Sequence, residues 1–252
     1  MCKIKDVISS DGKGIEANLE KENMTRILYL EDDPIIGTVT NEYLKMAGYD
    51  TEWICNGQEA LDRFKSDGNF DIVILDIIVP EIDGIKVLKE IRKMNQKVGI
   101  IMLSVLGDEK TQLETMDLLS DDYIIKPVSP VLLIKRIEAI MRRISPKQNS
   151  QTDELSVRGP LVMDAEGSRF LEDGKDVGFT ITEYTLLEIL YKHPKKVYTR
   201  EELLANIYDQ SYYGSDRVID THIKNIRKKL KRNYIRTMVG IGYKWNDEYG
   251  DD

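Results

Sequence analysis

The stretch Asp71-Ile72-Val73-Ile74-Leu75-Asp76 is a continuous apolar run that ends at a carboxylate, and Pro80 and Gly84 follow it closely. An apolar run bounded by turn residues is typical of a strand that is buried on both faces of a parallel sheet. Asp76 would then stand at the carboxyl end of this strand, where open α/β sheets place their ligand sites. On this stretch alone, a role for Asp76 as the cap of the next helix is an equally good interpretation.

The composition is that of an ordinary soluble protein. The chain has 252 residues, which is enough for one large or two ordinary domains, and it is 41% hydrophobic and 32% charged. No segment approaches the ~18 consecutive apolar residues of a membrane span. Cys2 and Cys55 are too few and too distant to indicate a disulfide scaffold, and no apolar signal segment follows Lys3 and Lys5. We therefore expect a cytoplasmic protein with no membrane contact.

The positive charge is concentrated near the end of an otherwise acidic chain. The formal net charge is −8, which taken alone argues weakly against a nucleic-acid partner. Between Arg217 and Arg236, however, the only acid is Asp220. Such a basic segment is either a local partner site or a solvated helix face. Its basic residues are Arg217, Lys224, Arg227, Lys228, Lys229, Lys231, Arg232 and Arg236.

Strand-like and helix-like segments alternate through residues 24–144, after a polar extension at 1–23. Such alternation predicts an α/β domain with a doubly wound, five-stranded parallel sheet of the flavodoxin-like kind and right-handed crossovers. We expect strands at 26–30, 49–54, 71–75, 98–103 and 121–126, and helices at 34–45, 57–64, 85–94 and 131–143, with one more polar helix after Ser104.

Reactive side chains follow the expected strands at their carboxyl ends: Glu31 and Asp32, then Asp76, Ser104 and Lys126. Carboxylates held close together must bind a hard cation, share a proton or pair with a base. Oxygen ligands with no neighbouring His or Cys favour Mg2+. A lysine and a hydroxyl at the same edge suit a transferred phosphoryl group. Asp76 would then be the nucleophile of an aspartyl-phosphate reaction.

Residues 24–143 resemble the receiver domain of bacterial two-component response regulators. The resemblance lies in Glu31-Asp32, in Leu75-Asp76 followed by Pro80 and Asp83-Gly84, in Ser104 and in Lys126-Pro127. It implies that a sensor histidine kinase phosphorylates Asp76. It also implies that Asp32, Asp76 and the carbonyl of Ile78 bind Mg2+, while Glu31 acts through water. Ser104 and Lys126 would contact the phosphoryl group. Tyr123 would be the aromatic residue that swings inward when Ser104 moves.

The same resemblance implies a dimer face made of ion pairs. Asp122, Arg136 and Arg142 fit that pattern, whereas Gln112 and Leu132 stand where a charged pair is expected. Surface pairs contribute about 0–1 kcal/mol each, so the missing pair weakens the inference of a homodimer without removing it. Leu119-Ser120 also replaces the usual Gly-Ala, so the loop before the fifth strand departs from the family.

After a polar linker at 145–157, the remaining residues, 158–252, predict a winged helix-turn-helix α+β domain. Thr199 and Glu202 form a capping-box pattern before a helix that runs through Tyr208. Thr182-Glu183 marks the start of another helix. The full expectation is strands at 161–164, 169–172 and 176–180, helices at 181–191, 199–208 and 216–231, and a closing hairpin at 234–238 and 242–245.

The basic helix at 216–231 has an apolar stripe that includes Val218, Ile219 and Ile226. One apolar face and one basic face, after a helix and a loop, are what a major-groove recognition helix needs. A merely soluble basic face is the alternative. The candidate DNA-binding residues, which fall largely off the stripe, are Arg217, His222, Lys224, Asn225, Arg227 and Lys228; for His222 the choice lies between a phosphate contact and a helix-surface position.

Residues 158–245 resemble the winged-helix effector domain of OmpR/PhoB-type regulators, through Arg217-Val218-Ile219-Asp220, His222-Ile223, Ile226-Arg227-Lys228-Lys229-Leu230 and Gly240-x-Gly242-Tyr243. The match also includes Ile181-Thr182, at the start of the helix expected at 181–191. Val239 departs from the family, since an Arg that enters the minor groove usually stands there, and the segment between Leu230 and Ile235 is short. Wing readout is therefore expected to be weak.

Together the two resemblances predict a transcription regulator, not an enzyme, that dimerises on activation and binds tandem DNA half-sites about one helical turn apart. RNA polymerase is a further candidate partner. Two alternatives remain open. One is an atypical regulator that binds DNA without phosphorylation. The other is a phosphohydrolase that uses an aspartyl-phosphate intermediate, but this alternative does not explain the presence of residues 158–245.

Overall fold

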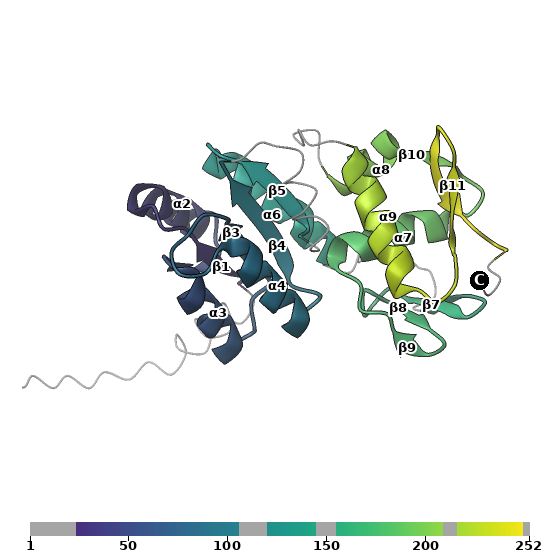
Figure 1. The fold of residues 1–252 in the computed structure, drawn as a ribbon, viewed down its shortest axis with the longest axis horizontal. Helices are drawn as coiled ribbons and strands as arrows, with labels where there is room; N and C mark the ends of the chain where they lie inside the picture. Colours follow the sequence, from purple (N-terminus) through teal and green to yellow (C-terminus); the bar gives the residue numbers. More distant parts are fainter. Residues whose placement is uncertain (1–23, 106–119, 145–154, 209–215, 249–252) are drawn as a thin grey trace, which may run out of the picture.

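The computed structural model describes residues 24–105, 120–144, 155–208 and 216–248. Their strands form one five-stranded sheet followed by two smaller sheets (Figure 1). Four predicted features lie outside the described residues: the extension at 1–23, the helix after Ser104 with Gln112 and Leu119, the linker at 145–154, and the loop at 209–214.

The first sheet is parallel, with strand order β2-β1-β3-β4-β5, which confirms the predicted doubly wound fold. Every residue of the central strand β3 (Ile72–Asp76) is buried, as expected for a strand covered on both faces. The other strands are β1 (Arg26–Leu30), β2 (Asp50–Ile54), β4 (Gly99–Ser104) and β5 (Asp122–Ile125).

Helices cover both faces of this sheet (Figure 1). Because successive side chains of a strand point to opposite faces, Leu75 belongs to one apolar cluster and Ile74 to the other. The cluster around Leu75 includes residues of α3 (Gly57–Ser66) and α4 (Gly84–Met94). The cluster around Ile74 includes residues of α2 (Pro34–Met46) and α6 (Pro130–Ile144).

Polar caps set where these helices begin. Asp33 caps α2 by accepting hydrogen bonds from the N–H groups of Ile35 and Ile36, with Pro34 as the first helical residue. Asn56 and Asp83 cap α3 and α4 in the same way. Asp33 is therefore occupied as a helix cap, although it follows directly on the two acids at the end of β1.

The second domain opens with an antiparallel sheet in the order β6-β7-β8-β9. β6 (Leu155–Arg158) covers residues that were mostly expected to be linker. They belong to the folded domain because β6 pairs with β7 (Leu161–Asp164). The third predicted strand of this sheet, 176–180, is wrong. After β8 (Arg169–Glu172), strand β9 covers only Lys175–Asp176, and residues 177–180 lead into the next helix.

Three helices follow: α7 (Ile181–Lys192), α8 (Arg200–Ile207) and α9 (Arg217–Lys229). The capping box of α8 at Thr199 and Glu202 is confirmed. The capping box of α7 pairs Glu183 with Thr180, so Thr182 is not the cap but lies inside the first turn. Because Thr180 is the cap, the Thr182 side chain is available for another contact.

The last sheet has the order β10-β12-β11, in which the predicted hairpin of β11 (Ile235–Met238) and β12 (Gly242–Trp245) is joined by β10 (Tyr198–Thr199). Trp245 is fully buried and packs against the rings of Tyr191 and Tyr234. The helices and the hairpin form the predicted winged-helix arrangement. No helix in the described ranges is long and apolar enough to cross a membrane.

Candidate acidic pocket and nucleic-acid interface

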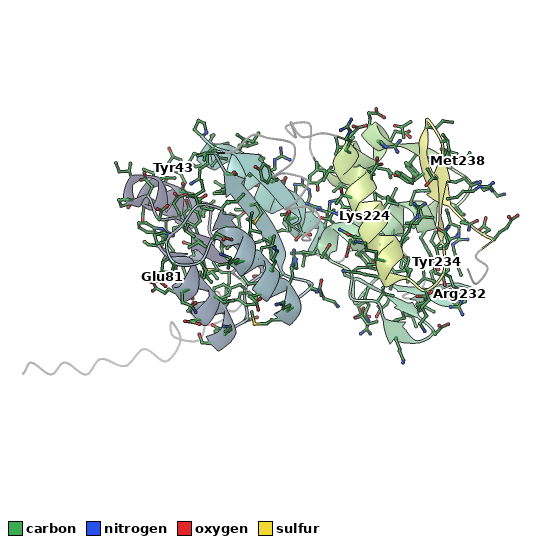
Figure 2. The ribbon with its side chains drawn as sticks, viewed as in Figure 1. Tyr43, Glu81, Lys224, Arg232, Tyr234 and Met238 are labelled. Atoms are coloured by element: carbon green, nitrogen blue, oxygen red, sulfur yellow. The ribbon has the colours of Figure 1, made fainter. Side chains whose placement is uncertain are left out.

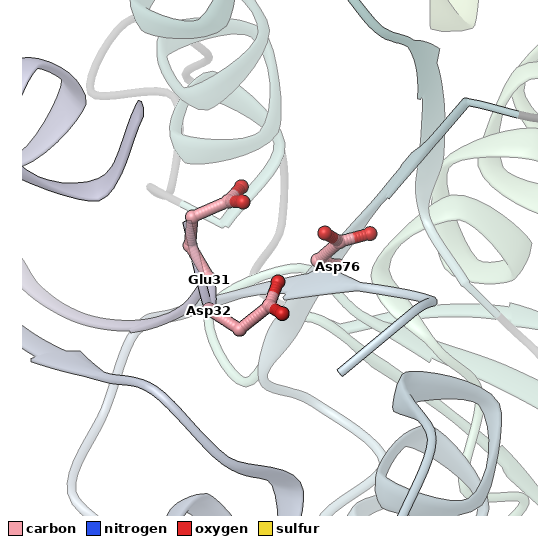
Figure 3. A group of neighbouring side chains, drawn as sticks. All are labelled: Glu31, Asp32 and Asp76. Carbon is pink, nitrogen blue, oxygen red and sulfur yellow. The ribbon is translucent and has the colours of Figure 1, made fainter. Parts of the chain in front are cut away.

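Glu31, Asp32 and Asp76 converge at the carboxyl edge of the parallel sheet, as predicted (Figure 3). One carboxylate oxygen of each lies within 4.8 Å of one oxygen of the others. β1 and β3 are adjacent and parallel, so their ends bring these residues together. Glu31 and Asp76 are buried and Asp32 is exposed, so the cluster has one open side.

Lys126 closes the buried side of this pocket. Its Nζ atom lies 2.6 Å from Glu31 Oε2 and 2.6 Å from Asp76 Oδ2. Burial lowers the pKa of Lys126, but the hydrogen bonds that its ammonium donates to Asp76 and Glu31 outweigh this effect, so the pKa is raised overall. Burial raises the pKa of Glu31 against the opposing effect of Lys126. The lysine is therefore held as a cation between two carboxylates.

The carboxylates suit a hard cation. Glu31 Oε1 is buried and has no hydrogen-bond partner among the described residues. A buried carboxylate oxygen without a donor is costly, and a divalent cation would satisfy it. No His or Cys belongs to the cluster, and an all-oxygen set is the donor chemistry that Mg2+ prefers.

The loop after β3 is shaped by the close approach of two backbone segments. A Cβ atom at Gly84 would lie 2.0 Å from the carbonyl oxygen of Asp76, so no larger residue fits there without movement. The N–H of Gly84 donates to the carbonyl of Ile77, and the N–H of Ile78 donates to Asp76 Oδ1 over 3.2 Å. Ile78 itself is 55% exposed.

Ser104 and Tyr123 lie on the neighbouring strands. Ser104 is fully buried at the end of β4, and the N–H of Lys126 donates to its carbonyl over 2.7 Å. Tyr123 is buried in β5, opposite Met102 in the register. The sheet thus brings the serine and the lysine to the edge that carries Asp76, as the strand pattern predicted.

The predicted DNA-binding residues of α9 differ in exposure, and Arg227 is half-buried. Arg217, Lys224 and Lys228 are exposed, and Lys224 is labelled on α9 in Figure 2. His222 is fully buried and Asn225 is 6% exposed, so their expected position on the solvent side of the helix is wrong. The buried face is wider than the apolar stripe because α9 packs against both α7 and α8.

Contacts inside the domain account for several polar residues of this helix. His222 Nε2 lies 3.2 Å from the hydroxyl of Tyr208. Arg227 donates through Nη2 to the carbonyl of Ile235 and to Thr237 Oγ1, which joins α9 to β11. These partners are distant in sequence, so helical spacing alone did not identify them.

Asp220, the single acid of the basic segment, has a structural role that the sequence did not reveal. Its Oδ1 atom accepts hydrogen bonds from Arg200 of α8 over 2.7 Å and from the hydroxyl of Tyr243 in β12 over 2.6 Å. It thereby joins α9 to both α8 and β12. A lone acid in a basic segment was the only signal of this role in the sequence.

The predicted dimer-face residues Asp122 and Arg136 are buried, whereas Arg142 is not. Arg136 Nη1 lies 3.5 Å from Asp122 Oδ2, and both side chains are almost fully buried within one chain. Their expected placement on an exposed face is therefore wrong for this conformation, because each is already paired with the other. Arg142 is exposed.

Comparison with known families shows what these two sites belong to. The model of the response regulator receiver domain matches residues 27–138, and that of the C-terminal domain of transcriptional regulatory proteins matches residues 174–245. The chain belongs to the OmpR/PhoB-type response regulators, which are DNA-binding transcription regulators activated by phosphorylation. Neither alternative, the phosphorylation-independent regulator or the phosphohydrolase, receives support.

Similar proteins span nearly its whole length. The transcriptional regulatory protein ResD of Bacillus subtilis is 35% identical over 90% of this chain and 98% of its own. The transcriptional regulatory protein BaeR of Escherichia coli is 34% identical over 89% of this chain and 94% of its own. Among solved structures, a RitR mutant covers 88% of this chain and 99% of its own, with a TM-score of 0.68 at 26% identity.

Proposed function

We propose that Asp76 is the residue that accepts the phosphoryl group from a sensor histidine kinase. The observation that carries this proposal is the 2.6 Å contact between Lys126 Nζ and Asp76 Oδ2 inside a carboxylate cluster. A carboxylate is a competent phosphoryl acceptor, and a buried ammonium beside it offsets the negative charge of the transferred group. In this role the chain is the substrate of the kinase and needs no turnover of its own.

Mg2+ would be held by Asp32, Asp76 and the carbonyl of Ile78, with Glu31 acting through water. The ion would neutralise charge on the phosphoryl oxygens. The partnerless Glu31 Oε1 supports this assignment. Ser104 is proposed to donate its hydroxyl hydrogen bond to the phosphoryl oxygens. Tyr123 is proposed to change its position with Ser104, since the two residues lie on paired strands.

The acceptor is tested by labelling the full chain with radioactive acetyl phosphate in the presence of Mg2+. We expect stoichiometric label in the wild type and none in Asp76→Asn. Asp83→Asn is the matched control, because Asn caps a helix as well as Asp does and residue 83 caps α4. Label retained by Asp76→Asn, or lost equally from Asp83→Asn, would contradict the assignment.

For the second domain, we propose that α9 enters the major groove and that its exposed cations, Arg217, Lys224 and Lys228, contact DNA directly. Two chains would bind tandem half-sites about one helical turn apart. Footprinting on genomic fragments bound by the phosphorylated protein tests this arrangement. We expect two protected segments with that spacing, and a single short segment would contradict it.

The remaining partners follow from this role. We propose a cytoplasmic homodimer on activation, in which Arg142 contributes from its exposed position and Asp122 and Arg136 exchange their internal pair for contacts with the second copy. RNA polymerase would be contacted by the DNA-bound form. The proposed division is a receiver at 24–144 and a winged-helix domain whose first described strand starts at Leu155.

A further inference from the structure

Tyr29 brings a hydroxyl group to the buried side of the acidic pocket. It lies in β1, two residues before Glu31, and its side chain is fully buried. Its hydroxyl donates a hydrogen bond to Glu31 Oε2 over 3.3 Å. An apolar side chain would suit a buried strand at least as well, because a buried hydroxyl is unfavourable unless it is hydrogen-bonded. The contact with Glu31 is therefore a candidate reason for a tyrosine at this position.

A second hydroxyl stands behind that of Tyr29. Burial raises the pKa of Tyr29, and the charge of Glu31 adds to this effect, whereas a hydrogen bond from the Thr40 side chain opposes it. Thr40 belongs to the buried face of α2 and is 3% exposed. The three side chains form a series of hydrogen bonds from α2 through β1 to the pocket. Because its pKa is raised, the tyrosine keeps its proton and remains a donor to the carboxylate.

The backbone of Glu31 is held on both sides. Its N–H donates to the carbonyl of Ile54 over 3.1 Å, and its own carbonyl accepts from Trp53 Nε1 over 2.8 Å. The indole of Trp53 lies against α2, where a Cβ atom at Gly37 would come within 2.2 Å of the ring. With both backbone groups held, the direction of the Glu31 carboxylate depends on its side-chain torsions and on the donors that it meets.

Two side chains donate to the same oxygen of Glu31, at different distances. Lys126 Nζ lies 2.6 Å from Oε2, and the Tyr29 hydroxyl lies 3.3 Å from it. Hydrogen bonds between two oxygen atoms are most often about 2.7–2.8 Å long, so the lysine makes the stronger contact here and the tyrosine contact has room to shorten. Oε1 has no partner among the described residues. Donors on Oε2 thus leave Oε1 as the available acceptor.

The two donors differ in their other contacts. Lys126 is shared between Glu31 and Asp76 and is also proposed to pair with the phosphoryl oxygens. An ammonium that turns toward a phosphoryl group loosens its contact with Glu31, and a buried carboxylate oxygen left without a donor is unfavourable. The Tyr29 hydroxyl has only the carboxylate to donate to, so it can remain with Glu31 when the lysine turns away.

We propose that Tyr29 is a positioning residue of the acidic pocket. Its hydroxyl becomes the principal side-chain donor to Glu31 Oε2 when Lys126 turns toward a phosphoryl group on Asp76, and it thereby keeps Oε1 directed at the metal site. The inference rests on the proposed roles of Asp76 and Lys126. It predicts that the importance of the Tyr29 hydroxyl for Mg2+ binding increases when the lysine is absent.

The test introduces Tyr29→Phe into the full chain of the wild type and of Lys126→Met. The substitution removes the hydroxyl and keeps the ring, and in Lys126→Met the tyrosine is left as the side-chain donor to Oε2. Titration with magnesium chloride, followed by the fluorescence of Trp53, measures the affinity. Tyr43→Phe is the matched control, because Tyr43 is a 45% exposed residue of α2, labelled in Figure 2, and its loss of a hydroxyl leaves the pocket unchanged.

We expect Tyr29→Phe to weaken Mg2+ binding by about two- to threefold in the wild type and by on the order of tenfold in Lys126→Met. Tyr43→Phe should leave the affinity unchanged in both. An equal loss in the two backgrounds would overturn the exchange of donors. Unchanged or tighter Mg2+ binding by Tyr29→Phe in both backgrounds would overturn the positioning role itself.

A third background separates positioning from packing. If Tyr29 acts through the carboxylate, Tyr29→Phe should change the Mg2+ affinity of Glu31→Gln by less than about twofold. A loss as large as in the wild type or larger would show that Tyr29 acts through packing, and would overturn the proposal. Urea denaturation verifies that each variant folds. Should Tyr29→Phe fail to fold, Thr40→Val takes its place with the same expected outcomes, since it removes the donor that holds the Tyr29 oxygen.

Labelling with acetyl phosphate distinguishes failure of this inference from failure of the proposed function. If the wild type takes up no label, Asp76 is not the acceptor and the proposed function fails, while the Mg2+ titrations still decide whether Tyr29 positions Glu31. If the wild type is labelled and Tyr29→Phe binds Mg2+ like the parent protein in every background, the proposal for Tyr29 alone is overturned.

Discussion

Lys126 Nζ lies 2.6 Å from Asp76 Oδ2, so the proposed phosphoryl acceptor is already paired with a cation before any phosphoryl group arrives. The lysine makes an equal contact with Glu31, which means that one ammonium holds two of the three carboxylates of the pocket. A metal ion in this pocket would compete with the lysine for the same carboxylates. This relationship allows the pocket to be tested without a kinase.

Replacing Lys126 with Met should strengthen Mg2+ binding by about ten- to hundredfold, because a neighbouring positive charge is removed from a partly buried site. Trp53 reports the titration, since its indole N–H donates to the Glu31 carbonyl over 2.8 Å, whereas Trp245 is buried in the other domain. Lys135→Met, on the surface of α6, is the control. Unchanged or weaker Mg2+ binding in Lys126→Met would show that the lysine does not oppose the metal.

The raised pKa of Glu31 predicts a pH dependence of stability. Burial makes the folded protein keep this proton to a higher pH than the unfolded chain does. The contribution of Glu31 to the free energy of unfolding should therefore fall as the pH rises from the unfolded value of about 4.5 through the folded pKa. Urea denaturation of the wild type and Glu31→Gln at several pH values measures this. The stability of the wild type relative to the variant should decline with rising pH, and a constant difference would contradict the assignment.

His222 and Lys224 should respond differently to substitution although they are two residues apart. His222→Ala removes a fully buried side chain and should lower the free energy of unfolding by about 2–4 kcal/mol. Lys224→Ala removes an exposed cation and should weaken DNA binding with little change in stability. It should also reduce the slope of log affinity against log salt by about 0.9.

Thermal denaturation and salt-dependent anisotropy separate these effects. A stable His222→Ala protein with a reduced salt slope would instead place His222 on a DNA phosphate. The sequence alone had left that contact open, and burial beside Tyr208 argues against it.

Val239 at the tip of the wing offers a gain-of-function test. It is 93% exposed, so a larger side chain at position 239 can extend into solvent. Val239→Arg should tighten DNA binding and steepen the salt slope by about 0.9, since one further phosphate contact becomes available. Val239→Gln is the uncharged control. If the Arg and Gln variants bind alike, the wing does not reach DNA.

The strand pattern predicted most of the acidic pocket. Glu31, Asp32, Asp76, Ser104 and Lys126 were placed at one edge because parallel strands align their carboxyl ends, and the register of β1, β3, β4 and β5 confirms that alignment. Such positions depend only on where a strand ends, which the sequence marks with turn residues and charges. The partners of Lys126 depend on the same alignment.

The polar residues of helices were predicted less well. Helical spacing identified the apolar stripe of α9 but placed His222 and Asn225 in solvent, because a periodic pattern does not show how many neighbours a helix packs against. The start of α7 at Ile181 was predicted, but the capping box that Thr180 forms with Glu183 was not. In both cases the deciding partner lies outside the apolar pattern of the helix.

The sequence by itself determined the order of the elements, the carboxyl-end residues of the pocket and the succession of a receiver and a winged helix, since these follow from local periodicity and from strand ends. Tertiary structure alone decided that Asp122 pairs with Arg136 inside one chain and that Asp121 binds Thr182 across the domains. The physical reason is that a buried charge needs a partner, and which residue provides it depends on packing between segments far apart in the chain.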